Sequence, residues 1–122
     1  MVYSKDLIKG TLKPIILKLL SDNGRMYGYQ ITQEVRELSK GKIEITEGAL
    51  YPLLHKLEAE KIVHVEKEMI GKRVRKYYSL SKTGKIVSTD MVQELNDFIG
   101  TLSTVLKIKS KKVFACYRFL GQ

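Results

Sequence analysis

Residues 45–60, ITEGALYPLLHKLEAE, constrain the fold more than any other stretch, because they combine a helix start with two contrasting faces. Thr46 is a good N-cap, and Glu47 places a carboxylate in the first turn, where the helix dipole favours negative charge. Four leucines then recur at helical spacing and predict one buried stripe: Leu50, Leu53, Leu54 and Leu57. The sequence therefore predicts an amphipathic helix over residues 46–60.

The opposite face of this helix carries few of the charged residues that are usual on a solvent-exposed helix. It presents Gly48, Tyr51, Pro52, His55 and Lys56. Inside an ordinary helix Pro52 would cost ~3 kcal/mol, because proline removes an amide and crowds the carbonyl four residues earlier. Such a face suits close approach of the backbone to another large surface. In the alternative interpretation the helix begins near Leu50, so that Pro52 falls in its first turn at little cost.

The charge of the chain indicates a polyanionic partner. The 122 residues include 22 Lys and Arg against 13 Asp and Glu, which gives a formal net charge of +9. The hydrophobic fraction of 43% and the charged fraction of 29% are typical of one globular domain. Nucleic acid is therefore the first candidate partner and an anionic membrane surface the second.

The sequence argues against secretion, membrane insertion and metal binding. The start, VYSKDLIKG after Met1, has no apolar signal core, and no apolar run approaches the ~18 residues of a membrane span. Cys116 and the two histidines, His55 and His64, do not make a metal-ligand set. We expect a cytoplasmic protein without metal or cofactor. Cys116 is interpreted as a small apolar residue, with a redox-sensing thiol as the less favoured alternative.

An N-terminal helix is predicted over residues 4–22, which place apolar residues at helical spacing: Ile8, Leu12, Ile15, Ile16 and Leu19. Pro14 interrupts a continuous helix unless it lies in a first turn. The segment is therefore expected to be two pieces that meet near Gly10 and Thr11. Gly24 suits a left-handed cap at its end.

A second helix is predicted to run to about Ser39, since Ile31, Val35 and Leu38 keep helical spacing. Tyr27 and Tyr29 flank Gly28 at its start, which indicates a tight contact there. Tyr29 is assigned to the core, whereas Tyr27 is open to either core packing or a hydrogen bond to phosphate. The short link to Thr46 predicts that the two helices form a helix-turn-helix.

Residues 63–80 have the alternating pattern of a β-hairpin with a turn at Gly71 and Lys72. Its tip is strongly basic and is followed by an aromatic residue, Tyr77; the basic residues are Lys72, Arg73, Arg75 and Lys76. Such a hairpin suits contact with a phosphate backbone or insertion into a minor groove. The alternative is a solvated turn whose charges discourage strand pairing at an edge.

The last predicted helix runs from the cap Ser81 through residues 82–109 and carries a heptad-like apolar seam. A small domain has little spare core for such a seam, so we expect it to pair with a second copy, whereas the alternative is packing within one chain. The residues assigned to dimerisation are Ile8, Met91, Leu95, Phe98, Leu102 and Val105. The structure of the tail, residues 110–122, is left open.

These elements together predict a mainly α fold with a small β-hairpin, an α+β winged helix-turn-helix with a long C-terminal dimerisation helix. The winged helix-turn-helix should occupy residues 1–80, the dimerisation helix residues 81–109 and the tail residues 110–122. Candidate DNA-binding residues lie at the start of the second predicted helix, on the helix at 46–60 and on the hairpin: Tyr27, Thr46, Gly48, Ala49, Tyr51, Pro52, His55, Lys56, Lys72, Arg73, Arg75, Lys76 and Tyr77.

Three separated motifs resemble the PadR family of bacterial transcriptional regulators. They are YGY at 27–29, GALYPLL at 48–54 with Leu57 and Glu58, and RKYYSLS at 75–81 with Gly84. The resemblance covers roughly residues 7–108 and is closest to members with a single long C-terminal helix. It implies a homodimeric repressor that places the helix at 46–60 in the major groove of double-stranded DNA, with the hairpin as wing.

By position, the resemblance implies that Gly48, Tyr51, Pro52 and His55 face DNA and that the basic hairpin residues and Tyr77 meet the backbone. The wing differs from the family's common GRRKYY by an additional residue, Val74. Multidrug-binding members hold flat aromatic ligands with an interface Trp, and this chain contains no Trp. The resemblance therefore gives little support to drug sensing.

Three other functions are weighed against a repressor. One is a switch with a small hydrophobic effector near Met91, Leu95 and Phe98, although such residues at helical spacing are more often core. Another is a winged-helix module that binds protein instead of DNA. An enzyme is the least favoured, because the sequence contains no set of nucleophile, base and orienting group and no phosphate-cradling glycine loop.

Overall fold

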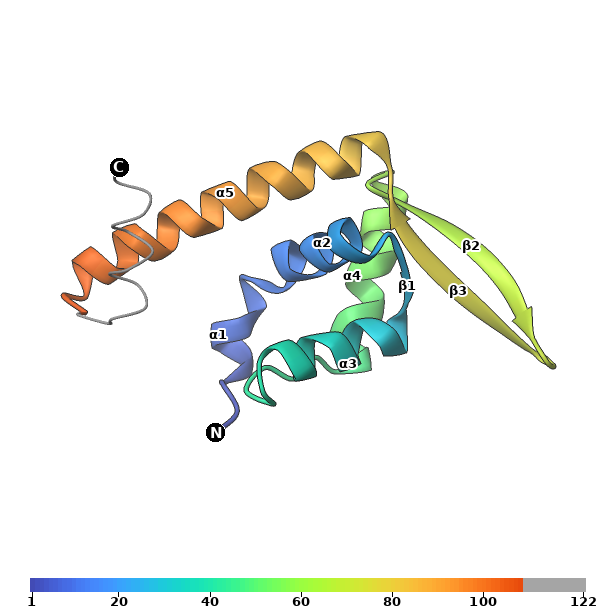
Figure 1. Cartoon of the computed structure of the whole chain (residues 1–122), viewed down its shortest axis with the longest axis horizontal. Coiled ribbons are helices and arrows are strands. Elements are labelled where there is room, and N and C mark those ends of the chain that lie inside the picture. The colour runs from blue at the N-terminus through green and yellow to red at the C-terminus, as the bar shows by residue number, and fades with distance from the viewer. Residues whose placement is uncertain (109–122) are drawn as a thin grey trace.

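The structure, a computed structural model, describes residues 1–108 (Figure 1). Helices and strands within this range follow the order α1 (Lys5–Lys9), α2 (Leu12–Asn23), β1 (Arg25–Tyr27), α3 (Gly28–Leu38), α4 (Glu47–Ala59), β2 (Val63–Ile70), β3 (Arg73–Leu80) and α5 (Lys82–Val105). In Figure 1 the hairpin of β2 and β3 projects from one end of the helical body, whereas α5 runs in the opposite direction over α2. The expected α+β winged helix-turn-helix is confirmed.

The N-terminal segment is two helices, as the position of Pro14 predicted. α1 starts where Ser4 Oγ accepts a hydrogen bond from the Leu7 amide at 3.3 Å, and it ends at Gly10. Pro14 is the third residue of α2. Amides in the first turn of a helix have no acceptor within the helix, so proline costs no hydrogen bond there. α2 ends at Gly24, whose φ of +82° suits glycine and whose N–H donates to the Leu20 carbonyl at 3.0 Å.

The sheet has three antiparallel strands in the order β1-β3-β2. β2 and β3 form the expected hairpin, in regular register from Val63 opposite Leu80 to Ile70 opposite Arg73. Gly71 begins the turn with a φ of +63°. β1 was not predicted, because residues 26–29 were interpreted only as the entry to a helix, and a three-residue strand is too short to show a period of two.

The core lies between α2, α3, α4 and the base of the sheet. Its fully buried apolar side chains come from every layer: Ile16, Leu17, Leu20, Ile31, Leu50, Leu54, Leu57 and Tyr78. Leu53 packs against this core and is partly buried. The assignment of Leu38 to the apolar stripe of α3 is wrong, because this residue is exposed in the last turn, just before the chain leaves the core through Lys40 and Gly41 with positive φ.

The start of α5 is docked on the turn between α4 and β2. Ser81 caps α5 by accepting a hydrogen bond from the Gly84 amide at 3.0 Å, and its hydroxyl lies 2.7 Å from the carbonyl of Lys61. A Cβ on Gly84 would lie only 3.1 Å from the carbonyl carbon of Ile62, so a larger residue would push the helix off this turn. Ser81 and Gly84 therefore fix where α5 leaves the domain.

The distal part of α5 leaves its apolar seam largely uncovered. Met91 and Leu95 are half-buried, whereas Phe98, Leu102 and Val105 are exposed, with Phe98 at 55%. α5 ends at Val105, a few residues before the expected end at 109. The predictions for the tail and for Cys116 fall outside residues 1–108. Within the described range, no helix combines the length and apolar character needed to cross a membrane.

Candidate nucleic-acid interface

α4 begins where its N-cap predicts. The Thr46 hydroxyl accepts a hydrogen bond from the Ala49 amide at 3.3 Å, and Glu47 is the first helical residue. The alternative start near Leu50 is therefore wrong, and Pro52 lies inside the helix. Pro52 and Gly48 are both exposed, so solvent can satisfy the Gly48 carbonyl that Pro52 leaves without a helical donor. The outer face of α4 consequently has low relief.

Tyr51 joins α4 to the start of α3. Its side chain is half-buried and lies against Gly28, where an added Cβ would come within 2.8 Å of Tyr51 Cζ. The tight contact expected at Gly28 is thus confirmed. The assignment of Tyr29 to the core is wrong, because the buried residues at this end of α3 are Gly28 and Ile31, and Tyr29 points away from them with 61% of its surface exposed.

A cleft of about 460 Å³ opens between α4, the N-terminus of α3 and the hairpin. It brings together six of the predicted DNA-binding residues: Tyr27, Tyr51, His55, Arg73, Arg75 and Lys76. Sequence reasoning did not assign four further lining residues to DNA: Tyr29, Ile70, Val74 and Tyr78. Tyr78 is buried in the core, and this burial raises its pKa above the ordinary value. The cleft wall is therefore aromatic and basic.

The remaining candidates lie outside this cleft. Gly48, Pro52 and Lys56 are exposed along α4, and Lys72 is exposed at the hairpin tip. Thr46 and Ala49 line a different pocket, of about 350 Å³, together with α1 residues such as Ile8. The predicted residues thus fall on α4, in the cleft and at the hairpin tip.

Arg75 is held at the cleft by aromatic contacts. Its guanidinium carbon lies 4.0 Å from the centroid of the Tyr27 ring. Tyr27 in turn meets Tyr77 edge-on, with ring centroids 5.6 Å apart and an interplanar angle of 83°. The neighbouring phenol of Tyr77 raises the pKa of Arg75 above its ordinary value, so the charge is fully retained. A cation–π stack of this kind orients the guanidinium before any ligand arrives.

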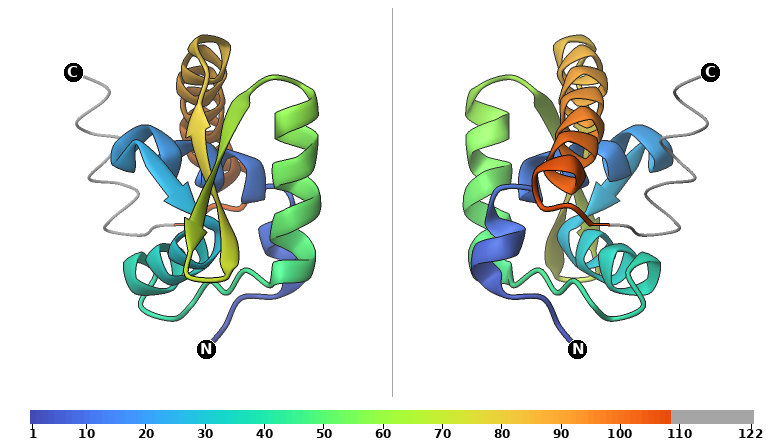
Figure 2. Two further views of the ribbon diagram at one scale, coloured as in Figure 1. Left: turned by 90° about the vertical axis from the view of Figure 1, so that its right-hand side faces the viewer. Right: turned by 90° about the vertical axis from the view of Figure 1, so that its left-hand side faces the viewer.

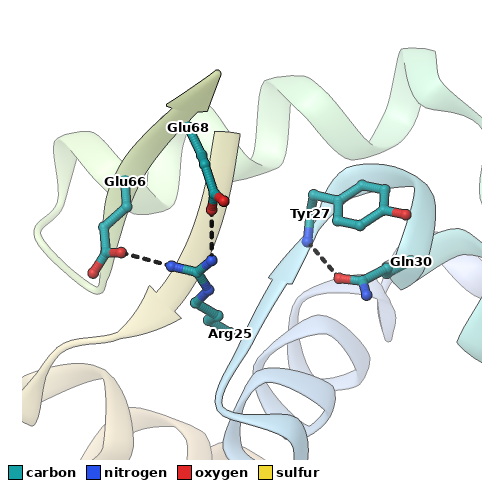
Figure 3. A network of polar contacts seen from close by, with 5 residues as sticks. All are labelled: Arg25, Tyr27, Gln30, Glu66 and Glu68. Carbon is teal, nitrogen blue, oxygen red and sulfur yellow. Dashed lines mark hydrogen bonds and ion pairs between the residues drawn. The ribbon is translucent and has the colours of Figure 1, made fainter. Parts of the chain in front are cut away.

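Arg25 stacks on the Tyr77 ring in the same way as Arg75 stacks on Tyr27. The sequence analysis did not predict a role for Arg25. Its guanidinium carbon lies 3.9 Å from the Tyr77 centroid. Figure 3 shows its two terminal nitrogens paired with Glu66 and Glu68, at 2.9 and 2.8 Å. The hydrogen bond to Glu68 is the main reason that the pKa of Arg25 is raised. The alternation of Arg25 with Tyr27, and of Glu66 with Glu68, was the available signal.

The other face of the hairpin carries an unneutralised lysine pair. Lys67 on β2 lies directly opposite Lys76 on β3, and both are exposed. Among the described residues neither ammonium group lies within 4.0 Å of a carboxylate oxygen. Directly opposed like charges destabilise a strand pair unless an anion neutralises them. Lys67 is therefore a further candidate for phosphate contact.

In the left view of Figure 2 the hairpin faces the viewer, with α4 (green) to its right and α3 (teal) at the lower left, and Figure 1 shows that the hairpin and α4 diverge from the end of α4 where β2 begins. The chemistry available on this side is that of a binding surface: basic groups held by aromatic rings, one imidazole and a low-relief helix face. Within the described part of the chain, no three His, Cys, Asp or Glu side chains are placed to hold a metal ion.

Comparison with known proteins identifies the family. The model of the transcriptional regulator PadR-like family matches residues 16–90. An uncharacterised protein from Lysinibacillus sphaericus is 34% identical over 92 residues, which cover 73% of this chain and 82% of that protein. A transcriptional regulator from Clostridium thermocellum has a similar structure, with 26% identity, a TM-score of 0.72 and coverage of 89% of this chain and 100% of that one.

Bacillus subtilis PadR, whose crystal structure was determined in complex with operator DNA, is also similar. It is 30% identical to this chain, with a TM-score of 0.62, and the match covers 67% of this chain and 46% of that one. The family model spans well over half of the sequence and includes α3, α4 and the hairpin. The chain belongs to the PadR-like family of transcriptional regulators.

Proposed function

We propose that this chain is a repressor that binds double-stranded DNA as a homodimer at a two-fold operator. The observation that carries the proposal is the cleft that joins the low-relief face of α4 to the basic hairpin. Bacillus subtilis PadR, which has a similar fold, was crystallised with operator DNA. In the proposed complex α4 enters the major groove and the hairpin follows the adjacent backbone.

α4 supplies sequence preference. Gly48 and Pro52 have no side-chain hydrogen-bonding groups. Because both side chains project little from the helix, the backbone of α4 can approach the base edges closely. Discrimination then depends on Tyr51, on His55 and on the shape of the groove. Because Tyr51 is seated against Gly28, its ring is oriented before DNA binds.

The hairpin supplies affinity. Arg75 is oriented by Tyr27, and the opposed pair of Lys67 and Lys76 lacks a counter-charge within the described chain. Phosphates would neutralise these groups and release condensed counterions, so binding should weaken steeply as salt rises. This contribution does not depend on base sequence.

The exposed seam of α5 supports dimerisation. Phe98, Leu102 and Val105 continue the heptad-like spacing of Met91 and Leu95 and are exposed in the part of the chain that the structure describes. A second copy would bury them, and two-fold symmetry would then present two α4 helices to half-sites separated by ~34 Å or a multiple.

The division of labour between α4 and the hairpin predicts different outcomes for Tyr51→Ala and Arg75→Ala. Binding should be measured by fluorescence anisotropy on a duplex selected from a random pool and on random duplex. Tyr51→Ala should lower the preference between them by roughly tenfold, since one good base contact contributes ~1–3 kcal/mol. Arg75→Ala should weaken both equally and lower the slope of log affinity against log salt by about one.

Arg36→Ala is the matched control, because Arg36 is exposed in the last turn of α3 and its loss changes the net charge identically. Arg36→Ala should leave the affinity for both duplexes and the salt slope nearly unchanged. Equal losses on both duplexes from Tyr51→Ala and Arg75→Ala would contradict the assignment of specificity to α4. Weak binding to both duplexes without a salt slope would favour the protein-binding alternative.

A further inference from the structure

Arg25 connects the two outer strands of the sheet. In the order β1-β3-β2, strands β1 and β2 are not neighbours and share no backbone pairing. Arg25 on β1 nonetheless reaches Glu66 and Glu68 on β2, and its guanidinium crosses over Tyr77 of β3 on the way (Figure 3). One side chain therefore contacts all three strands.

A second cation–π contact joins β1 and β3 in the opposite direction. Arg75 on β3 stacks on Tyr27 of β1, while Arg25 on β1 stacks on Tyr77 of β3. Tyr27 immediately precedes α3, and its amide donates to Gln30 Oε1 at 3.0 Å (Figure 3). The next residue, Gly28, seats Tyr51 of α4. A continuous set of contacts thus runs from the hairpin to the outer face of α4.

The Arg25 side chain is held by three partners within the sheet. Both terminal nitrogens donate to carboxylates, and one face of the guanidinium is covered by Tyr77. A phosphate contact through the N–H groups that bind Glu66 and Glu68 would have to replace two charge-assisted hydrogen bonds, which are about twice as strong as neutral ones. In addition, the single positive charge of Arg25 offsets part of the negative charge of Glu66 and Glu68, two carboxylates on the arginine face of the hairpin.

We propose that Arg25 is a positioning residue for DNA recognition, which orients the hairpin relative to α4 through Glu66, Glu68 and Tyr77 without itself contacting DNA. The inference rests on the proposed DNA-binding function. Exposed ion pairs add little to folding stability, so their effect should be on the orientation of Arg73 and Arg75 and not on whether the domain folds.

The sharpest test is the double variant Glu66→Gln/Glu68→Gln. Removing two negative charges from a DNA-binding surface should strengthen binding if electrostatics alone matters. Positioning predicts the reverse, because Arg25 loses both of its negatively charged partners and keeps at most weaker, neutral hydrogen bonds: affinity should fall by about fivefold on selected and random duplex alike. Glu37→Gln/Glu94→Gln is the control, since it changes net charge equally on exposed residues of α3 and α5.

Arg25→Gln provides a second test through a double-mutant cycle. It should weaken DNA binding in the unaltered protein but have a much smaller effect when Arg75→Gln is already present, because Arg25 acts through the hairpin arginines. Fully additive losses would show an independent DNA contact by Arg25 and overturn the proposal. So would tighter binding by Glu66→Gln/Glu68→Gln that equals or exceeds that of its control.

Hydrogen exchange of the free protein tests the same contacts without DNA. Amides of residues 66–76 should exchange faster in Arg25→Gln than in the unaltered protein, whereas unchanged exchange would overturn the proposal. If the unaltered protein binds neither duplex, both the proposed function and the role of Arg25 are wrong. If it binds DNA but the variants behave like their controls, only the role of Arg25 is wrong.

Discussion

α4 and α5 both carry an apolar stripe, but the stripe of α4 is buried and the distal stripe of α5 is exposed. Leu50, Leu54 and Leu57 of α4 are completely buried within the domain. On α5, Phe98 and Val105 remain 55% and 68% exposed. α4 therefore completes its apolar packing within residues 1–108 and is free to present its outer face, whereas these residues leave the distal apolar stripe of α5 exposed. The difference supports our proposal that the domain recognises DNA and that α5 mediates assembly.

Leu54→Ala should have the largest effect and tests the buried side of the comparison. Truncating a fully buried leucine removes its packing and leaves a cavity, so the free energy of unfolding should fall by ~2–5 kcal/mol in urea denaturation. Leu102→Ala is the matched substitution on the exposed stripe and should change the unfolding of a dilute monomer by less than ~1 kcal/mol. Similar losses from both would remove the distinction between the stripes.

Gly28→Ala tests whether the outer face of α4 depends on its contact with α3. The added methyl group would displace the Tyr51 ring and should lower stability by ~1–3 kcal/mol, with a matching loss of preference for the selected duplex. Gly10→Ala is the control, because nothing lies within 4 Å of a Cβ there and its φ of −74° suits alanine. Unchanged stability and DNA preference in Gly28→Ala would contradict the seating of Tyr51.

Leu102→Ala also tests whether the exposed stripe of α5 forms a dimer interface. If the seam is the dimer interface, the dimer dissociation constant should rise roughly tenfold, or ~1.4 kcal/mol, in sedimentation analysis. Ile86→Ala provides the control, since Ile86 is an exposed α5 residue outside the seam spacing and its loss should leave the constant unchanged. A monomer at all concentrations would contradict dimerisation through this seam.

The smallest expected effect concerns Tyr78, which lies where the core meets the cleft. Burial raises its pKa in the folded state, so the unfolded chain loses this proton first, near the ordinary value of about 10. The folded state is then disfavoured as pH rises above that value. Stability should fall less steeply at alkaline pH in Tyr78→Phe than in the unaltered protein, and equal slopes would contradict a buried, neutral Tyr78.

Much of the fold could be predicted because its signals are local. The cap at Thr46, the glycine turn at Gly71 and the position of Pro14 each act through residues a few positions away. The errors at Tyr29 and Leu38 have one cause: helical spacing shows which residues share a face but not where the core ends along the helix.

The interface was predicted less completely because its contacts depend on register between distant strands. The basic and aromatic residues of the hairpin were identified by type. Their arrangement in two crossed stacks requires β1 to pair with β3 so that Tyr27 lies opposite Tyr77. A three-residue strand is too short to show a period of two, so the alternation of Arg25 with Tyr27 hints at a shared face but does not predict the pairing of β1 with β3.

The most direct test of the central claim is an anisotropy titration of the protein with DNA flanking its own gene and with random duplex, each at several salt concentrations. We expect a complex of dimer size that binds the flanking DNA at least ~10³-fold more tightly than random duplex, with a steep decrease of affinity as salt rises. Equal and weak binding to both, together with a flat salt dependence, would contradict this expectation.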